Sequence, residues 1–373
     1  MKKIIILLLT IFLTSGCSYV ELNDLAVVSV LGIDYDNENN NFNLTAQVMN
    51  VKNSSEGSTE EDTLIYETSG KTIAKAIRNF GVRYPKNVYL GHLEFIILNK
   101  NVTSKINDIF DYIMRSPEVR SSAYVAITKE DSAKEILKPN NEVKDSFPVE
   151  SLKTVLLDAK ERTGTIYDLT LEEFLSFYLK KGIDPLVPII KNEDKKGMRA
   201  SSIVIEDLAP LKNQTLGKEL NEIQSISYST LNNYYKDIVM ETKYKNIYIG
   251  SVIYNPKSKI DLNIKDNNIK VNLDVNIESK IIEIGNKENL LNKESEKELK
   301  GLINNTMKKN IESLITYSKK ENTDILGLKS IIYKNYNNKY SEYKDKNIYE
   351  LADFNINVNN KMYRFGNINK GAW

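Results

Sequence analysis

Apolar and polar side chains alternate most regularly between Lys259 and Ile277. The apolar positions are Ile260, Leu262 and Ile264 and, after the polar turn Asp266-Asn267-Asn268, Ile269, Val271, Leu273, Val275 and Ile277. Side chains two positions apart lie on the same face of a strand, so this pattern buries one face and leaves the other in water. The stretch therefore predicts two antiparallel strands joined in a hairpin.

Helical spacing follows, from about Glu294 to Lys320. Apolar residues there recur three or four positions apart, at Leu299, Leu302, Ile303, Met307, Ile311, Leu314 and Ile315. This spacing predicts a long amphipathic helix. The segment 322–327 interrupts the pattern, and Leu328 to about Tyr340 resumes it as a second helix. Alternation over Ala352–Val358 predicts a final strand, which we expect to end in a turn at Asn359-Asn360.

The N-terminal third mixes strand and helix patterns. Runs rich in β-branched residues predict strands at Ala26–Asp34, Phe42–Val51, Leu64–Thr68, Asn87–Leu98 and Ala123–Thr128. The first two of these are expected to form a hairpin. Thr72 stands where the N-cap of a helix with a core face at Ile73, Ala76, Ile77 and Phe80 would lie. Thr103 is expected to cap a second helix with a core face at Ile106, Ile109, Phe110, Ile113 and Met114.

The middle of the chain begins at a break, Lys138-Pro139-Asn140-Asn141, and is mainly helical in pattern. Thr170-Leu171-Glu172-Glu173 is a capping box, in which the threonine hydroxyl and the glutamate carboxylate each satisfy a free backbone N–H. The charged segment Lys191–Gly197 is interpreted as a linker. A strand at Ala200–Ile205 and a helix from Thr215 to about Asn233 are expected after it.

These patterns predict an α+β fold of three domains, built from mixed or antiparallel sheets with packed helices. The expected division is an N-terminal α+β domain over 17–137, a smaller and mainly helical domain over 138–197, and a C-terminal α+β domain over 198–373. The last domain holds the antiparallel strands and the long amphipathic helix. No Gly-rich phosphate loop stands at a strand-to-helix junction, which disfavours a nucleotide-binding fold.

The first seventeen residues, MKKIIILLLTIFLTSGC, differ in kind from the rest. Two lysines precede an apolar run, Ile4–Leu13, that is too short to span a bilayer, which needs about 20 residues. The run therefore predicts a signal peptide over 1–16 that is removed on export. Cys17 directly follows small residues, as in bacterial lipoprotein signals, so its sulfur is the expected attachment point for a lipid. Stable anchoring takes two lipid chains, and a single chain binds only marginally.

Composition then removes several classes of function. The chain has 51 Lys and Arg against 50 Asp and Glu, and neither sign forms a long block, so no global field draws in nucleic acid. Cys17 is the single cysteine and His92 the single histidine, which excludes disulfides and Cys/His zinc sites. We therefore predict no catalytic residue, no cofactor and no metal. His92 is interpreted as a structural strand residue, with a general base as the alternative.

Several short stretches, taken in order, resemble the Ger(x)C family, the C subunits of spore germinant receptors. They are Cys17; Glu21, Leu22, Asn23 and Asp24 with Leu25-Ala26; Leu31-Gly32-Ile33-Asp34; Ser69–Ile73; His92–Phe95; Arg115–Arg120; and Thr323-Asp324-Ile325-Leu326-Gly327. Ser18-Tyr19 stands where the family often has a tryptophan, and Leu328 replaces a second glycine. The resemblance implies structural or interface roles for Glu21, Leu22, Asn23, Asp24, Gly32, Asp34, His92, Asp324 and Gly327.

The resemblance further implies a non-catalytic lipoprotein, held by its lipid on the outer face of the spore inner membrane. It would assemble with two integral membrane partners, the A and B subunits, into a receptor for small nutrients. Whether this subunit contacts the nutrient is left open by the sequence. The alternatives are a solute-binding lipoprotein of a nutrient importer, which should show two lobes with parallel sheets, and a cell-surface hydrolase, for which no nucleophile motif is visible.

Overall fold

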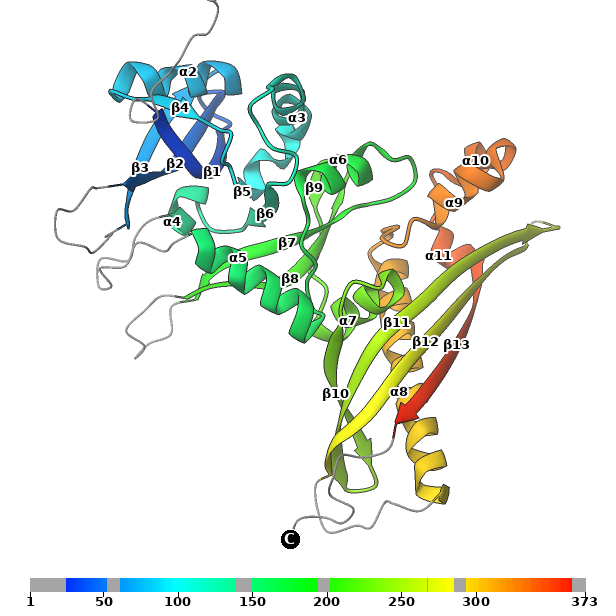
Figure 1. Ribbon diagram of the computed structural model, residues 1–373. Coiled ribbons are helices and arrows are strands. Elements are labelled where there is room, and N and C mark those ends of the chain that lie inside the picture. Colours follow the sequence, from blue (N-terminus) through cyan, green and yellow to red (C-terminus); the bar gives the residue numbers. More distant parts are fainter. Residues whose placement is uncertain are drawn as a thin grey trace, which may run out of the picture.

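The computed structural model describes residues 25–51, 61–137, 149–193, 202–266, 268–284 and 293–363. Two sheets organise these residues, and α-helices pack on both (Figure 1). The larger sheet has the strand order β3-β2-β1-β5-β6-β7-β8-β9, with β4 paired to β1, and the smaller has the order β10-β11-β12-β13. The predicted α+β class, with mixed sheets, packed helices and a long C-terminal helix, is confirmed.

The larger sheet begins as an antiparallel meander and continues with parallel strands. Its first strands are β1 (Leu25–Asp36), β2 (Asn41–Val51), β3 (Glu61–Gly70), β4 (Asn87–Tyr89), β5 (Phe95–Asn99) and β6 (Tyr124–Thr128). β1 pairs antiparallel with β2 and parallel with both β4 and β5. The predicted hairpin of the first two strands is confirmed. β5 is buried along its whole length, as parallel strands covered on both faces usually are.

The helices of this region are α2 (Ile73–Arg83), η2 (Lys100–Lys105), α3 (Ile106–Arg115) and α4 (Ala133–Leu137). Thr72 caps α2 as predicted, because its side chain accepts the Lys75 N–H at 3.2 Å. The predicted cap at Thr103 is wrong: its hydroxyl donates to the Lys100 carbonyl inside the 3₁₀ turn η2, and α3 starts three residues later. Met114, predicted to be core, is 57% exposed.

The predicted single strand over Asn87–Leu98 is also wrong. The structure divides it into β4 and β5, with a turn at Gly91-His92 between them. Leu90 and Leu93 are both buried on either side of this turn. An apolar run that turns back into the core looks like one long strand in sequence, because both arrangements bury the same side chains.

The larger sheet continues through the middle of the chain. The elements there are α5 (Val149–Asp158), the π-helical turn η3 (Ala159–Thr163), α6 (Leu171–Leu179), β7 (Leu186–Glu193), β8 (Ser202–Lys212) and β9 (Thr215–Leu216). The capping box at Thr170 is confirmed. β7 pairs with β6 on one side and with β8 on the other, so Lys191 lies in a strand, where a linker was predicted. The sheet thus crosses the expected boundaries at 138 and 197, and the three-domain division stays a prediction.

The predicted helix over Thr215–Asn233 is only partly present. Thr215 and Leu216 form the short strand β9, and the helix α7 (Glu222–Asn232) starts later, at its own capping box of Asn221 and Gln224. β10 (Asp237–Tyr244) follows and was not predicted, although its exposed and buried residues alternate strictly. It forms one edge of the smaller sheet.

The smaller sheet confirms the alternation described above. β11 (Ile247–Lys265) and β12 (Asn268–Ile284) pair antiparallel over the predicted hairpin, and β13 (Ala352–Tyr363) pairs parallel with β12. The turn predicted at Asn359-Asn360 is wrong, because both residues stay in β13. The amide of Asn359 donates to Asn276 of β12 at 3.3 Å, in a ladder of polar side chains on the exposed face of the sheet.

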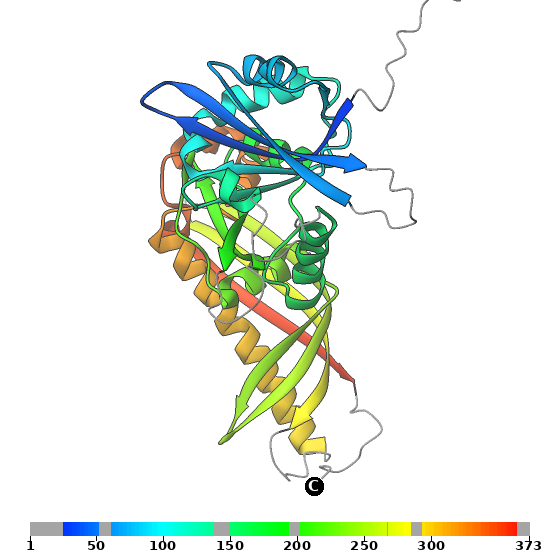
Figure 2. The ribbon, with the colours of Figure 1, turned by 90° about the vertical axis from the view of Figure 1, so that its left-hand side faces the viewer.

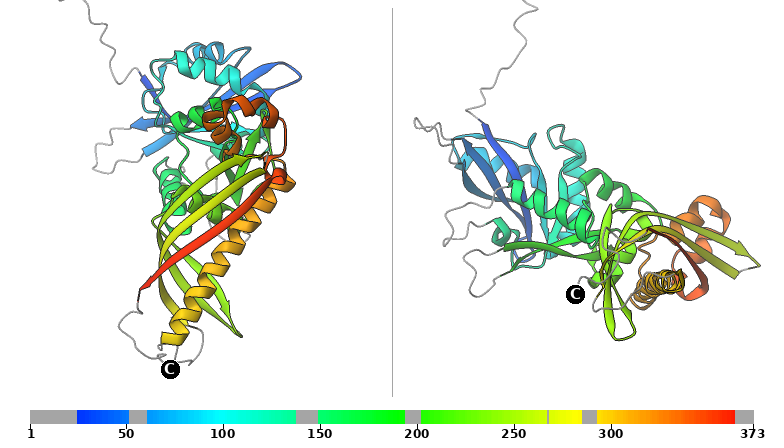
Figure 3. Two further views of the ribbon diagram at one scale, coloured as in Figure 1. Left: turned by 90° about the vertical axis from the view of Figure 1, so that its right-hand side faces the viewer. Right: turned by 60° about the horizontal axis from the view of Figure 1, so that its bottom comes forward.

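The long helix α8 (Lys293–Lys320) lies along the smaller sheet (Figure 3). Its buried aliphatic side chains are Leu299, Ile303, Met307, Ile311 and Leu314, among the residues described. At roughly 1.5–3 kcal/mol for each fully buried aliphatic side chain, this stripe stabilises the helix against the sheet by about 10 kcal/mol. Short helices follow, α9 (Leu328–Asn335), α10 (Asn337–Tyr343) and α11 (Ile348–Leu351), so the second predicted helix breaks at Tyr336.

Candidate functional site

The segment between α8 and α9 contains two of the residues singled out by sequence, Asp324 and Gly327. Asp324 is only 3% exposed, and its carboxylate accepts the backbone N–H of Leu328 at 2.9 Å and of Lys329 at 2.8 Å. It thereby caps the first turn of α9, where these N–H groups have no partner within the helix. The hydroxyl of Tyr349 donates to the same carboxylate at 3.2 Å. Asp324 therefore fixes the direction in which the chain leaves α8.

This segment contacts the loop that precedes β7 of the larger sheet. The backbone N–H of Asp324 donates to Oδ2 of Asp184 at 2.7 Å, and the Asp184 N–H donates to the Asp324 carbonyl at 3.0 Å. The hydroxyl of Thr323 also donates to Asp184, at 3.1 Å. Residues 182–184 and 323–330 thus form one contact between the two sheet regions, named here the Asp184–Asp324 junction.

Two glycines let the backbones approach closely at the Asp184–Asp324 junction. Gly182 has φ +76°, and a Cβ there would lie 2.7 Å from the backbone of Lys329 and Ser330. Its carbonyl accepts the Ser330 N–H at 2.9 Å. Gly327 has φ +68°, and a Cβ there would lie 3.1 Å from Ile183. A side chain at either position would be strained in this backbone conformation and would press the two segments apart.

The electrostatics of the junction centre on Asp324. Burial raises the pKa of its carboxyl to about 6, while the N–H groups of Lys329 and Leu328 act in the opposite direction. The charge of Asp184 raises it further. Burial and the nearby Asp324 carboxylate also raise the pKa of Tyr349 well above its ordinary value. Asp324 therefore joins the elements of the junction through hydrogen bonds from two backbone N–H groups and from the Tyr349 hydroxyl.

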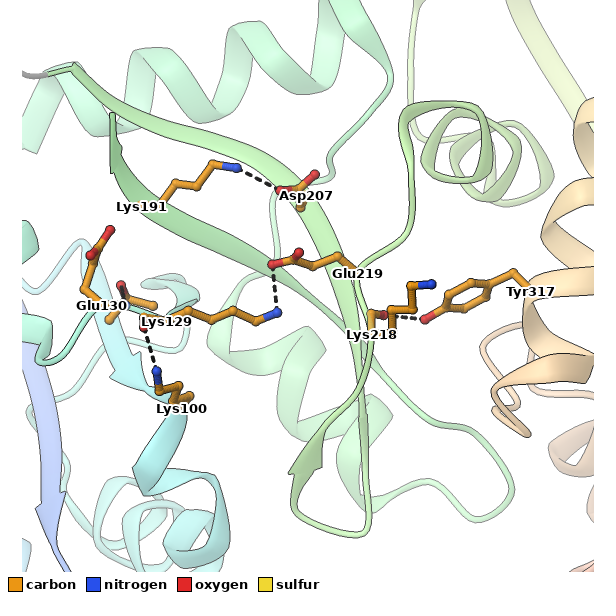
Figure 4. A network of polar contacts seen from close by, with 9 residues as sticks. Lys100, Lys129, Glu130, Lys191, Asp207, Lys218, Glu219 and Tyr317 are labelled. Carbon is orange, nitrogen blue, oxygen red and sulfur yellow. Dashed lines mark hydrogen bonds and ion pairs between the residues drawn. The ribbon is translucent and has the colours of Figure 1, made fainter. Parts of the chain in front are cut away.

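A second bridge between the sheet regions runs through the connection from β9 to α7 (Figure 4). Nζ of Lys129, just after β6, lies 2.8 Å from Oε1 of Glu219. The carbonyl of the preceding residue, Lys218, accepts a hydrogen bond from the hydroxyl of Tyr317 on α8. One short connection therefore contacts the larger sheet on one side and the long helix on the other.

Gly32 and Asp34 share one location, on β1 beneath α4. A Cβ at Gly32 would lie 3.0 Å from Cδ1 of Leu137 and 3.1 Å from Cβ of Ala133, so glycine here allows α4 to pack directly on the strand. The half-buried Asp34 accepts the Ala133 N–H at 2.8 Å. Burial raises the pKa of Asp34 to about 6, opposed by this hydrogen bond and reinforced by the charge of Glu135.

The remaining sequence candidates lie elsewhere. His92 is exposed in the turn between β4 and β5, with its ring 5.9 Å from that of Tyr89. Cys17, Glu21, Leu22, Asn23 and Asp24 lie outside the described residues, as does the predicted signal peptide. Asp34, His92 and Asp324 occupy three different places in the fold, and each contacts its own set of neighbours.

Two stretches carrying the resemblance meet at a groove of about 770 Å³ between α2 and α3. Its lining includes Lys71, Thr72 and Ile73 from one stretch and Arg115, Ser116 and Pro117 from the other. The groove is lined by both positively and negatively charged side chains, among them Arg78 and Asp108. Among the described residues, no three His, Cys, Asp or Glu side chains gather as a set of metal ligands. None of the helices described is both long and apolar enough to cross a bilayer.

Sequence reasoning missed Asp184 and Tyr349. Asp184 was passed over as part of the stretch between Gly182 and Pro185 that ends a helix. Tyr349 was passed over because a tyrosine in a short helix carries no local signal of a buried partner. Both residues act through hydrogen bonds to residues that are distant in the sequence, and a local sequence pattern does not predict such contacts.

Comparison with known proteins places this architecture. Residues 18–192 match a family model described as the spore germination protein N-terminal domain, and residues 206–366 match one described as spore germination B3/GerAC like, C-terminal. The fold resembles that in the crystal structure of the GerBC protein, with a TM-score of 0.53 and 17% identity over 89% of this chain and 96% of that chain. The chain belongs to the Ger(x)C family of spore germination proteins.

Three relatives from Bacillus subtilis (strain 168) show the same membership. Spore germination protein B3 is 24% identical over 95% of each chain, and spore germination protein A3 is 26% identical over 75% of this chain and 74% of the relative. Spore germination protein KC is 23% identical over 52% of this chain, which spans only half of that relative. The resemblance read from short sequence stretches is thereby confirmed.

Proposed function

We propose that this chain is a lipid-anchored, non-catalytic subunit of a nutrient germinant receptor, needed for spore germination. The observation that carries the proposal is the pair of germination family matches, which together extend from residue 18 to residue 366. They begin directly after Cys17, the expected lipid attachment point. The tether would hold the body on the outer face of the spore inner membrane, beside integral membrane A and B subunits.

The described residues support a role in assembly. The side chains that the sequence singled out hold elements together: Asp34 and Gly32 seat α4 on β1, and Asp324 joins α9 to the loop at Asp184. Each acts through backbone hydrogen bonds or close packing. A rigid body with a defined relation between its two sheets suits a subunit that presents surfaces to membrane partners.

The test replaces Cys17 with Ala in the spore-forming host. We expect loss of membrane retention and strongly impaired germination in response to nutrients, because the body is no longer held beside its partners. Ser18→Ala, one residue further on, is the matched control and should behave as the parent. Capture of the tagged parent from solubilised spore membranes should bring down two integral membrane proteins. Full membrane retention and normal germination of the Cys17→Ala strain would contradict the proposal.

A further inference from the structure

Helix α2 and its flanks carry a local excess of positive charge. Between Glu67 and Glu94 the sequence contains no acidic residue and five basic ones, Lys71, Lys75, Arg78, Arg83 and Lys86. Over the whole chain, by contrast, 51 basic residues balance 50 acidic ones. A local excess in a balanced chain indicates a surface that meets a negatively charged partner.

The helix presents these charges outward. Ile73, Ala76 and Phe80 are buried against the body, so the opposite side of the helix faces solvent. Along that side lie Lys75, Arg78 and Val82, spaced three and four residues apart, and Val82 is 83% exposed. Val82 adjoins Arg83 and lies one turn beyond Arg78, so this side of α2 presents an exposed apolar side chain beside cations, a combination that suits contact with an anionic membrane surface.

The nearest acidic groups leave most of this charge unopposed. Asp111 on α3 is paired with Arg115, its Oδ1 lying 2.9 Å from Nε of that arginine. Asp108 lines the α2–α3 groove together with Arg78. Hydrogen bonds from Asn39 hold the pKa of the Asp36 carboxyl below its ordinary value, and the nearby charge of Lys71 adds a smaller effect in the same direction. Within the described part of the chain, Lys75 contacts no carboxylate that would neutralise it.

The position of α2 brings this surface close to the expected anchor. β1 begins at Leu25, which pairs with Asn87, the residue directly after Lys86. α2 lies at this end of the molecule, and the lower end of α8 lies at the opposite end (Figures 1 and 2). Eight residues from Cys17 to Leu25 reach at most about 28 Å when fully extended. A lipid on Cys17 would therefore keep α2 within reach of the bilayer surface.

We propose that the outer face of α2 docks on a membrane surface rich in anionic lipids, which orients the body on the membrane. Lys75 and Arg78 contact lipid phosphates, and Val82 enters the boundary of the headgroup layer. The biological setting rests on the proposed function, because it takes the lipid on Cys17 as given. Each lysine or arginine near such a surface strengthens binding by about fivefold, and added salt screens the attraction.

The experiment measures sedimentation with vesicles of the mature chain, residues 17–373, carrying Cys17→Ser so that neither lipid nor signal segment contributes. We expect binding to vesicles of phosphatidylcholine and phosphatidylglycerol, little binding to phosphatidylcholine alone, and release by salt. The double variant Lys75→Glu/Arg78→Glu should lose at least about tenfold in partition coefficient. Lys308→Glu/Lys309→Glu, the same charge change on exposed positions of α8, is the matched control and should bind as the parent.

Three outcomes would overturn the docking surface: no preference of the parent for anionic vesicles, unchanged binding of the α2 variant, or an equal loss in the α8 control. Circular dichroism of each variant checks the fold, and the milder Lys75→Gln/Arg78→Gln variant should show an intermediate loss. Because the test chain carries no lipid, its result is independent of the Cys17→Ala germination assay. A negative result in the vesicle assay would overturn the docking surface and leave the proposed function untouched, and a negative result in the germination assay would do the reverse.

Discussion

The backbone N–H of Asp324 donates a hydrogen bond of 2.7 Å to the carboxylate of Asp184, across 140 residues of sequence. One partner precedes a strand of the larger sheet, and the other follows the long helix of the smaller sheet. At this junction one carboxylate accepts two hydrogen bonds, from the Asp324 N–H and from the Thr323 hydroxyl, and so links the two sheet regions.

Replacing Asp184 with Ala should loosen this junction. The substitution leaves the buried Asp324 N–H without its acceptor, and a hydrogen bond to a charged group contributes about 1.5–3 kcal/mol. We expect faster hydrogen exchange at Asp324, Leu328 and Lys329, while β11 and β12 keep their protection. Asp158→Ala, at an exposed side chain that pairs with Arg162 one helical turn away, is the control and should shift stability by less than about 0.5 kcal/mol. Unchanged exchange at the junction would contradict the role given to Asp184.

Two glycine substitutions should have opposite effects. Gly32→Ala places a methyl group 3.0 Å from Cδ1 of Leu137 and 3.1 Å from Cβ of Ala133, so the side chains of α4 must shift by a few tenths of an ångström, and we expect a loss of about 1–3 kcal/mol. Gly301→Ala, within α8, meets nothing within 4 Å and should stabilise by about 0.5–1 kcal/mol through helix propensity. Thermal unfolding of both variants beside the parent measures the difference. A Gly32→Ala protein as stable as the parent would mean that α4 does not need this close approach.

Stability should fall as the pH rises through the range in which Asp324 ionises. Its pKa is about 6 in the folded state against 3.8 for the free group, so between these values the folded state holds a proton that the unfolded state has lost. The folded state is therefore favoured at low pH, and this advantage, on the order of 3 kcal/mol, disappears as the pH rises to about 6.

Denaturant titrations from about pH 4 to pH 7 measure this dependence. Asp324→Asn cannot ionise and should flatten it, even though the variant is less stable overall because its amide accepts one N–H where the carboxylate accepted two. Asp34, whose pKa is also about 6, contributes in the same direction, so Asp34→Asn should flatten it as well. Asp345→Asn, at a side chain that is 87% exposed, is the control. An unchanged pH profile in Asp324→Asn would show that this carboxyl does not titrate in the range given.

Local patterns predicted the elements whose burial is regular. Alternation over Lys259–Ile277 gave a hairpin because each strand buries one face, and the spacing of Leu299, Ile303 and Met307 gave α8 because that stripe is its buried side. The capping box at Thr170 was visible because both of its partners lie within four residues. β7 escaped prediction because Pro188 interrupts its strand pattern, although Pro188 pairs with Leu208 in the sheet.

The sequence by itself determined the family, the α+β class, and most helices and hairpins, while the export signal with Cys17 stays a prediction. These properties reside in residues that lie near one another along the chain. Three features were decided only by the tertiary structure. β12 and β13, which are joined through α8, pair in parallel; the Asp184 carboxylate accepts the Asp324 N–H; and glycine at position 32 allows α4 to pack on β1. Each of these features depends on contacts between segments that are far apart in the sequence. Close packing between such segments produces no periodic pattern of residues, so the sequence alone does not predict it.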